Sequence, residues 1–218
     1  MTEMTMIRRT TMAGRVRSAV VLLAGVAGLA GSADVAAQMA PMAKTEQMAP
    51  MTKMDAVPAV GQKAPDFTLT SLDGAKVRLS NEVTAGPVAL VVLRGFPTYQ
   101  CPFCTRQFAD YLAHGDDFHA SGAHVLFVYP GDPEGLNDHA KALVAGRPMP
   151  ANYKILMDPD YTFTRAYNLR WDAPKETAYP STFVIDKNGM IVFAKTSHAH
   201  ADRVPTADVL KVLAELPR

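Results

Sequence analysis

VALVVLRGFPTYQCPFC, residues 88–104, is the stretch of sequence from which the fold of this chain is best predicted. It opens with a continuous apolar run, residues 88–93, which is typical of a strand buried on both faces of a sheet. It closes on Cys101 and Cys104, which are the only cysteines in the chain. Aromatic and aliphatic residues follow at helical spacing and predict a helix that reaches about His119. The cysteine pair is therefore expected where a buried strand gives way to a helix.

The spacing of the cysteines predicts a reactive pair. Free N–H groups and the positive dipole end of a helix stabilise a thiolate, so we expect the pKa of Cys101 to fall from its usual ~8.5 toward neutrality. Pro102 suits the first helical turn, where its missing N–H is not needed. Cys104 lies one turn further on, with a more ordinary pKa, where it can resolve an oxidised Cys101 by forming a disulfide. We expect Cys101 to be the exposed member, because an attacking thiolate must be reached by its substrate.

Two other interpretations of the cysteine pair compete with this one. A structural disulfide is one, although two residues of separation cannot staple distant segments. A two-cysteine metal site is the other. Structural zinc would need further cysteines or histidines at ligand spacing, and none stands near the pair. The sequence predicts no metal and no cofactor.

The rest of the chain predicts an α/β domain, residues 59–218. Apolar runs and turn residues alternate in the order strand, helix, strand, helix, hairpin, helix, which is typical of an α/β sandwich. The expected elements besides the central strand and helix are a hairpin of residues 67–70 and 76–79, a strand at 124–129, helices at 134–145 and 161–167, a hairpin of 181–186 and 190–194, and a last helix that turns its apolar residues at 209–213 inward.

The N-terminus predicts export. Four arginines precede an apolar run, residues 19–30, that is too short to span a bilayer comfortably. Small residues then favour cleavage before Gln38, so residues 1–37 are interpreted as a signal peptide and the mature protein is expected in the periplasm or another extracytoplasmic space. An uncleaved, membrane-anchoring start is the alternative. We expect no stable membrane insertion of the mature protein.

Residues 38–58 predict a disordered tether, because they are rich in Met, Ala and Pro and show no apolar periodicity. A Gln-Met-Ala-Pro-Met unit begins at Gln38 and again at Gln47. Soft thioether ligands suit Cu(I), so a copper carrier that combines the tether with the cysteine pair is one functional hypothesis. A low-complexity linker is the simpler interpretation. The methionines concerned are Met39, Met42, Met48, Met51 and Met54.

Composition excludes some functions. The chain has 218 residues, of which 48% are hydrophobic, so it can bury one substantial core. Its 22 basic and 21 acidic residues give a formal net charge of +1, which provides no basic surplus for binding phosphates. Nucleic acid is therefore not an expected partner.

Three segments together resemble a known family. Residues 94–104, RGFPTYQCPFC, residues 179–186, YPSTFVID, and residues 60–69, VGQKAPDFTL, are similar to the peroxiredoxin-like branch of the thioredoxin superfamily, the alkyl hydroperoxide reductase/thiol-specific antioxidant proteins. The resemblance implies a thioredoxin-like fold, with a central mixed β-sheet flanked by helices. It also implies that Cys101 attacks the peroxide O–O bond and becomes a sulfenic acid, and that Thr98 hydrogen-bonds peroxide and thiolate.

Two positions depart from the family pattern. Arg94 stands where these proteins place a proline seven residues before the reactive cysteine. Pro180 stands where they place an arginine that steadies the thiolate. This proline resembles instead the cis-proline of thioredoxin-type oxidoreductases, so we expect a cis peptide bond at Pro180 with its ring near the sulfur of Cys101. Arg94, Arg170 and Arg203 are the candidates for the missing cation.

The remaining candidates receive simpler interpretations. His198 and His200 could bind a metal, but they lie in a polar segment and a solvated loop is favoured. Trp171 is expected to pack beside the active site rather than to recognise a ligand. The other histidines show no common spacing and are expected at the surface; they are His114, His119, His124 and His139.

Two enzyme functions therefore stand ahead of the copper carrier. In the first, the chain is an antioxidant enzyme that reduces hydroperoxides and receives electrons from an external thiol donor such as a thioredoxin-like reductase. Thr98 and the family resemblance favour it. In the second, the chain exchanges disulfides with protein clients, which the two-residue gap of the cysteine pair and Pro180 favour. Both functions would use Cys101 as attacker and Cys104 as resolver.

Overall fold

The computed structural model describes residues 56–217. The predicted signal peptide, residues 1–37, lies outside the described residues, as does the predicted tether, 38–58, except for its last three positions. The methionines of the copper hypothesis lie outside them too. Within residues 56–217, no helix is long and apolar enough to cross a membrane.

The described chain alternates strands and helices. Its elements are β1 (Thr68–Ser71), β2 (Lys76–Arg78), α1 (Leu79–Ala85), β3 (Val88–Val92), α2 (Pro102–Ala113), α3 (Gly115–Ala120), β4 (His124–Gly131), α4 (Leu136–Val144), β5 (Tyr153–Pro159), α5 (Thr162–Ala166), β6 (Ser181–Ile185), β7 (Ile191–Thr196) and α6 (Thr206–Ala214).

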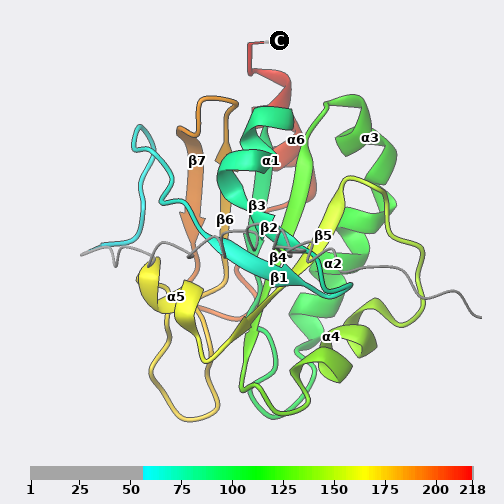
Figure 1. Ribbon diagram of the computed structural model, residues 1–218, viewed down its shortest axis with the longest axis vertical. Helices are drawn as coiled ribbons and strands as arrows, with labels where there is room; N and C mark the ends of the chain where they lie inside the picture. The colour runs from blue at the N-terminus through cyan, green and yellow to red at the C-terminus, as the bar shows by residue number, and fades with distance from the viewer. Residues whose placement is uncertain (1–55, 218) are drawn as a thin grey trace, which may run out of the picture. The chain divides into compact units, whose positions relative to one another are not determined.

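Among the described residues, seven strands form one mixed sheet in the order β2-β1-β5-β4-β3-β6-β7 (Figure 1). β3, β4 and β5 run parallel, whereas β6 pairs antiparallel with β3, and β1 pairs antiparallel with β5. The expected α/β, thioredoxin-like architecture is confirmed. Parallel strands present their carboxyl ends at one edge of a sheet, and crevices at that edge are where α/β folds place their sites. The cysteine pair follows the carboxyl end of β3 and so lies at this edge.

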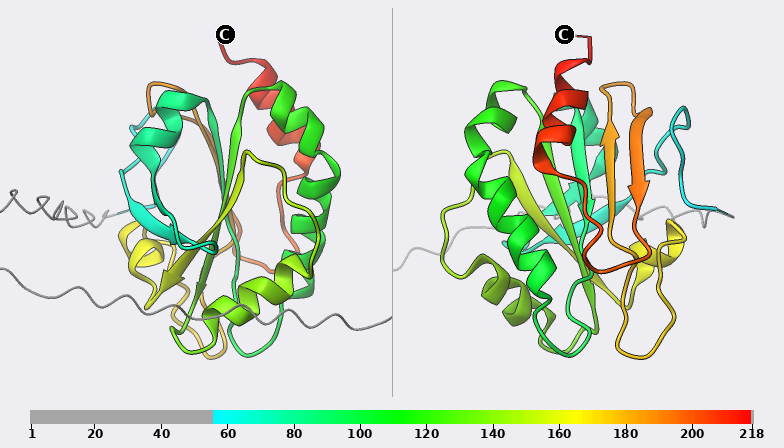
Figure 2. Two further views of the ribbon diagram at one scale, coloured as in Figure 1. Left: turned by 45° about the vertical axis from the view of Figure 1, so that its right-hand side comes forward. Right: turned by 180° about the vertical axis from the view of Figure 1, so that it is seen from behind.

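Helices cover both faces of the sheet (Figure 2). α2, α3, α4 and α6 lie on one face, and α1 and α5 on the other. β3 shows why, because its residues alternate between two apolar layers: Ala89 and Val91 face the layer under α2, and Val88 and Leu90 face the layer under α1. Since both layers are apolar, every residue of β3 is hydrophobic.

Two elements are absent from the sequence-based prediction. β5 was not predicted, although Tyr153, Ile155 and Met157 alternate toward the same apolar layer. α1 was also missed. It follows β2 without a break, and Arg78, the residue before it, makes no side-chain capping bond. The usual signal for a helix start is therefore missing from its sequence.

The helix predicted from the cysteines to about His119 is interrupted. α2 ends at Ala113 and α3 begins at Gly115, with His114 leaving helical geometry between them (φ −104°, ψ 21°). The His114 ring nitrogen Nδ1 lies 2.9 Å from the carbonyl oxygen of Asp110, at the end of α2. A Cβ on Gly115 would meet the Pro150 ring at 2.8 Å. The chain therefore turns where a glycine lets another segment pack closely.

Candidate active site

The loop between β3 and α2 places the cysteines. Gly95 adopts φ +70°, and an added Cβ there would lie 1.9 Å from the carbonyl oxygen of Pro130. Only glycine fits so close to β4. The N–H of Phe96 donates to the same oxygen at 3.2 Å. Cys101 then directly precedes α2 and Pro102 occupies its first turn, which confirms the predicted position of the pair.

Cys101 is buried, so the prediction of an exposed thiol is wrong. It is 1% exposed, because it belongs to the apolar layer under α2, with Phe96 and Phe103 packed against that layer. The pKa of Cys101 nevertheless lies well below its ordinary value, chiefly because the Cys104 thiol hydrogen-bonds to its sulfur. Burial opposes this lowering, and the first free N–H groups of α2 and the charge of Arg203 support it.

Cys104 has the opposite character. It is fully buried, and burial raises its pKa well above the ordinary value, with its hydrogen bond to Cys101 acting in the same direction. The expectation of an ordinary pKa for Cys104 is therefore wrong. Both cysteines are free thiols in this structure, so the redox-active disulfide stays a prediction. The pair nonetheless divides as expected, into a cysteine that favours the thiolate and a partner that keeps its proton.

Arg203 is the candidate arginine whose side chain reaches the cysteines. It lies between β7 and α6, and one of its terminal nitrogens lies 3.7 Å from the sulfur of Cys104. Another lies 3.4 Å from the Gln107 side-chain oxygen on α2, and Nε donates to the carbonyl oxygen of His200 at 2.8 Å. Its positive charge lowers the pKa of both Cys101 and Cys104.

Arg94 contributes through its backbone. Its N–H faces the sulfur of Cys104 and favours the anion there. Its side chain is buried and points away to other partners: Nε donates to a Glu176 carboxylate oxygen at 2.6 Å, and the terminal nitrogens donate to the carbonyl oxygen of Lys175 at 2.6 Å and to the Tyr99 hydroxyl at 3.0 Å. Arg94 thereby ties the loop before the cysteines to the segment before β6.

Two of the predicted site residues, Arg170 and Thr98, make no hydrogen bond to either cysteine sulfur in the described part of the chain. Arg170 stacks over the ring of Tyr161 at 4.1 Å and donates to backbone carbonyl oxygens, including that of Thr177 at 2.6 Å. Thr98 lies exposed in the loop before α2. Its hydroxyl makes no hydrogen bond to either sulfur in this structure.

The expected cis bond at Pro180 is wrong, because the described chain contains no cis peptide bond. The Pro180 carbonyl oxygen accepts a bond from the Ser197 N–H at 2.8 Å, which prolongs the pairing of β6 with β7. Pro180 lines a small depression together with Gln107 and Arg203. The site therefore lacks the cis-proline feature of thioredoxin-type oxidoreductases.

Other polar residues near the cysteines were not identified from the sequence. The Tyr129 hydroxyl, at the end of β4, donates to the Gln100 side-chain oxygen at 2.9 Å. The pKa of Tyr129 is raised, first by burial and then by the nearby negative charge of the cysteines. The period-two pattern of β4 was a usable signal, because it puts Tyr129 on the face that carries α2.

Aromatic rings flank the segment that binds Arg94. Trp171 stacks on Tyr179 with ring centroids 4.7 Å apart, so its predicted packing role is confirmed. The two histidines of the predicted solvated loop differ. His198 is exposed and meets the Tyr179 ring edge-on, whereas the His200 ring nitrogen Nε2 lies 3.0 Å from Glu176. The loop is solvent-exposed as predicted, and the His200 side chain is 34% exposed, but its contact with Glu176 was not predicted.

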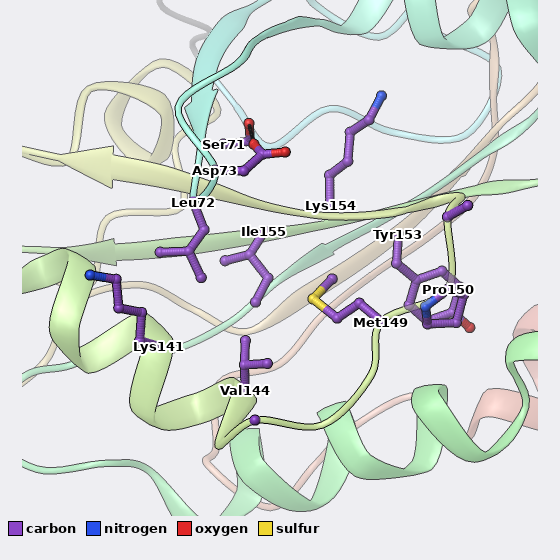
Figure 3. A pocket seen from close by; sticks show the side chains of 12 residues that line it. Ser71, Leu72, Asp73, Lys141, Val144, Met149, Pro150, Tyr153, Lys154 and Ile155 are labelled. Atoms are coloured by element: carbon purple, nitrogen blue, oxygen red, sulfur yellow. Dashed lines mark hydrogen bonds between the residues drawn. The ribbon is translucent and has the colours of Figure 1, made fainter. Parts of the chain in front are cut away.

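The lining of the pocket in Figure 3 includes neither cysteine. The pocket has a volume of about 480 Å³ and opens between the β1–β2 turn, α4 and the start of β5. Leu72, Val144, Met149 and Ile155 point into it. Within residues 56–217, no group of three or more His, Cys, Asp or Glu side chains is arranged to hold a metal ion.

A mixed sheet flanked by helices, with an asymmetric Cys-x-x-Cys pair at the start of a helix, defines a thioredoxin-like thiol-dependent oxidoreductase. The model of the AhpC/TSA family matches residues 60–194. This covers more than half of the chain, which therefore belongs to that family, the peroxiredoxin-like branch of the thioredoxin superfamily.

Individual relatives agree with the family. A "putative peroxiredoxin" of Mycobacterium tuberculosis (strain ATCC 25618 / H37Rv) is 29% identical over 140 residues, which cover 62% of this chain and 83% of the relative. A thiol-disulfide oxidoreductase, ResA, of Geobacillus kaustophilus (strain HTA426) is 32% identical over 133 residues, 61% of this chain and 67% of the relative. The crystal structure of peroxidoxin BcpB from Mycobacterium tuberculosis has a TM-score of 0.59 at 19% identity, over 73% of this chain and 98% of that one, which shows a shared fold.

Proposed function

We propose that this enzyme reduces hydroperoxides, with Cys101 as the attacking thiolate and Cys104 as the resolving thiol. The observation that carries the proposal is the asymmetry of the pair. Three influences favour the anion at Cys101, namely the Cys104 thiol, the start of α2 and Arg203, whereas burial keeps Cys104 protonated. Membership of the AhpC/TSA family supports the same chemistry.

The proposed reaction has three steps. The Cys101 thiolate attacks one peroxide oxygen, the O–O bond breaks, and the leaving oxygen takes a proton, so that Cys101 becomes a sulfenic acid and the substrate an alcohol or water. Cys104 then gives up its proton and attacks the Cys101 sulfur, which forms a disulfide and releases water. An external dithiol donor reduces this disulfide with two electrons and is itself oxidised. Thr98 is the proposed hydroxyl partner of the bound peroxide.

Disulfide exchange with protein clients is the second candidate. The two-residue gap of the pair and the similarity to a thiol-disulfide oxidoreductase favour it. Two observations favour the peroxidase instead. Cys101 is 1% exposed, so a protein disulfide has no access to its sulfur in this conformation, whereas a small peroxide needs less opening. The peptide bond before Pro180 is trans, so the cis-proline that supported disulfide exchange is absent.

We also propose that the enzyme acts outside the cytoplasm. The arginine-rich start and the apolar run of residues 19–30 support export, with cleavage before Gln38. N-terminal sequencing of the protein from its native host should give a mature chain that begins at or near Gln38. An intact start recovered from the membrane fraction would contradict this.

The roles of the two cysteines are tested by Cys101→Ser and Cys104→Ser. After one equivalent of hydrogen peroxide, wild type should lose two free thiols and two mass units. C101S should keep its thiol and its mass. C104S should react once and gain one oxygen as a sulfenic acid, and should take up further oxygens only when more peroxide is added, because no partner thiol caps it. The measurement is intact mass with a free-thiol count. If C104S alone abolishes the first reaction, the roles are reversed.

A further inference from the structure

His200 makes two contacts that the proposed reaction has not used. Its ring nitrogen Nε2 lies 3.0 Å from Oε1 of Glu176, and its carbonyl oxygen accepts a 2.8 Å bond from Nε of Arg203. The first contact fixes the ring, and the second fixes the guanidinium that faces Cys104. His200 thus links the carboxylate of Glu176 to the arginine beside the cysteine pair.

Glu176 is a rigid anchor for this link. Its side chain is 12% exposed, and its other oxygen, Oε2, accepts a 2.6 Å bond from Nε of Arg94, whose side chain is 2% exposed. A carboxylate held by a buried guanidinium has little freedom to follow a moving ring. The Trp171 ring, 5.4 Å from the His200 ring between centroids, limits the ring on another side.

The remaining bonds in this loop do not replace that anchor. The Ser197 hydroxyl and the backbone of Ala199 hydrogen-bond to each other, and Lys195 pairs with Asp202 at 2.5 Å. These contacts fold the segment upon itself. The Ser197 N–H bonds to the Pro180 carbonyl oxygen at the start of the loop. Among the described contacts of residues 198–202, the one between His200 and Glu176 is the side-chain hydrogen bond that joins the loop to the segment carrying Arg94's partners.

We propose that His200 is a positioning residue: its ring, held by Glu176, keeps the guanidinium of Arg203 beside the Cys101–Cys104 pair. The inference rests on the proposed function in one respect, because it takes Cys101 to be the reactive thiolate. The role differs from catalysis, since His200 contacts neither sulfur. Its effect should reach the cysteines through Arg203 alone.

The test measures the thiolate pKa of Cys101 from the pH dependence of its alkylation by iodoacetamide, followed by mass spectrometry on the reduced full chain. Arg203→Ala should raise this pKa by about 1 unit, because an opposite charge at this range lowers a pKa by roughly 1–3 units. His200→Ala should raise it by about half as much, equivalent to a roughly threefold fall in thiolate fraction below the pKa. The double variant H200A/R203A should match R203A alone.

Three further variants separate positioning from general loosening. His200→Gln keeps a donor near the position of Nε2, so the pKa of Cys101 should stay close to its wild-type value. His200→Asn is too short to reach Glu176 and should raise this pKa as H200A does. H200N also serves if H200A fails to fold. His198→Ala is the matched control, because His198 lies in the same loop, is exposed, and does not contact Glu176. It should leave the pKa unchanged.

Several outcomes would overturn the proposal: an unchanged pKa in H200A and H200N, an unchanged pKa in R203A, or a double variant in which the two shifts simply add. The peroxidase proposal fails separately. If wild type reacts with hydrogen peroxide no faster than a free thiol while H200A and R203A still share one pKa effect, the positioning role stands and the peroxidase assignment falls.

Discussion

Two carboxylates lie at opposite ends of the parallel strands, and each contacts one basic side chain and one histidine ring. Glu176, at the cysteine end, binds Arg94 and His200. Glu82, on α1, contacts His124 at the start of β4 and Lys154 on β5, both at 2.5 Å. The local electrostatics are alike. The pKa of each carboxyl is lowered, because hydrogen bonds from its partners outweigh the raising effect of burial.

The two clusters differ in what the partners of the carboxylate contact. Arg94 is 2% exposed and its backbone faces Cys104, so the cysteine-end cluster is connected to the reactive pair. His124 and Lys154 have side chains that are 25% and 35% exposed, and they join α1 to the start of β4 and to β5. The same charge pattern therefore serves chemistry at one end of the strands and stability at the other. The exposure of the partner side chains should also determine how much unfolding free energy is lost when each carboxylate is removed.

The largest difference is expected from removing the carboxylates. Glu176→Ala leaves the buried guanidinium of Arg94 without its counter-ion, and should lower the free energy of unfolding by about 3 kcal/mol. Glu82→Ala should cost only about 1 kcal/mol, because His124 and Lys154 can turn to water. Urea denaturation followed by circular dichroism measures both. Equal losses in the two variants would contradict the importance of solvent access.

Glycines at the two ends of the parallel strands should differ in how much stability an alanine substitution costs. Gly95 and Gly122 both have φ +70°, so alanine strains the backbone at either position. A Cβ at Gly122 meets nothing within 4 Å, whereas at Gly95 it meets the Pro130 carbonyl oxygen at 1.9 Å. Gly122→Ala should therefore cost about 1 kcal/mol of unfolding free energy, and Gly95→Ala clearly more.

The Gly95 substitution should also disturb the chemistry. Moving the loop away from β4 shifts the start of α2, so the alkylation rate of Cys101 at pH 7 should fall in G95A and stay at the wild-type value in G122A. A G95A protein that alkylates normally would show that the contact with Pro130 does not position the pair.

The smallest expected effect is on acid stability. Glu82 has a lowered pKa in the folded protein, so its stabilising contribution is present above the unfolded value of ~4.3 and is lost as pH falls through the folded value. Glu82→Gln should flatten this part of the acid-unfolding curve without changing peroxide reactivity at pH 7. A change in peroxide reactivity would mean that the two clusters are coupled.

Local sequence patterns predicted the sheet and the cysteine pair because their determinants are contiguous. The apolar run before Arg94 and the Cys-Pro-Phe-Cys motif each lie within a few residues, and both were found where expected. Arg94 and Glu176 are 82 residues apart in the sequence, so no local pattern indicates their contact. The same holds for Arg203 and Cys104, which are 99 residues apart.

The wrong predictions share a physical cause. Exposure of Cys101 and the cis bond at Pro180 were inferred from each residue's chemistry, but tertiary packing decides both. The apolar layer under α2 buries Cys101, and the segment that carries Pro180 is bonded to the end of β7 through Ser197. The contact of His200 with Glu176 was not predicted, because Glu176 belongs to another segment of the chain.

Stopped-flow mixing of the reduced wild-type protein with hydrogen peroxide tests the central claim most directly. The account predicts a reaction far faster than that of a free thiol, first order in peroxide and absent in C101S, which ends in one disulfide between Cys101 and Cys104. It is contradicted if wild type consumes peroxide no faster than a free thiol while it still reduces a protein disulfide quickly.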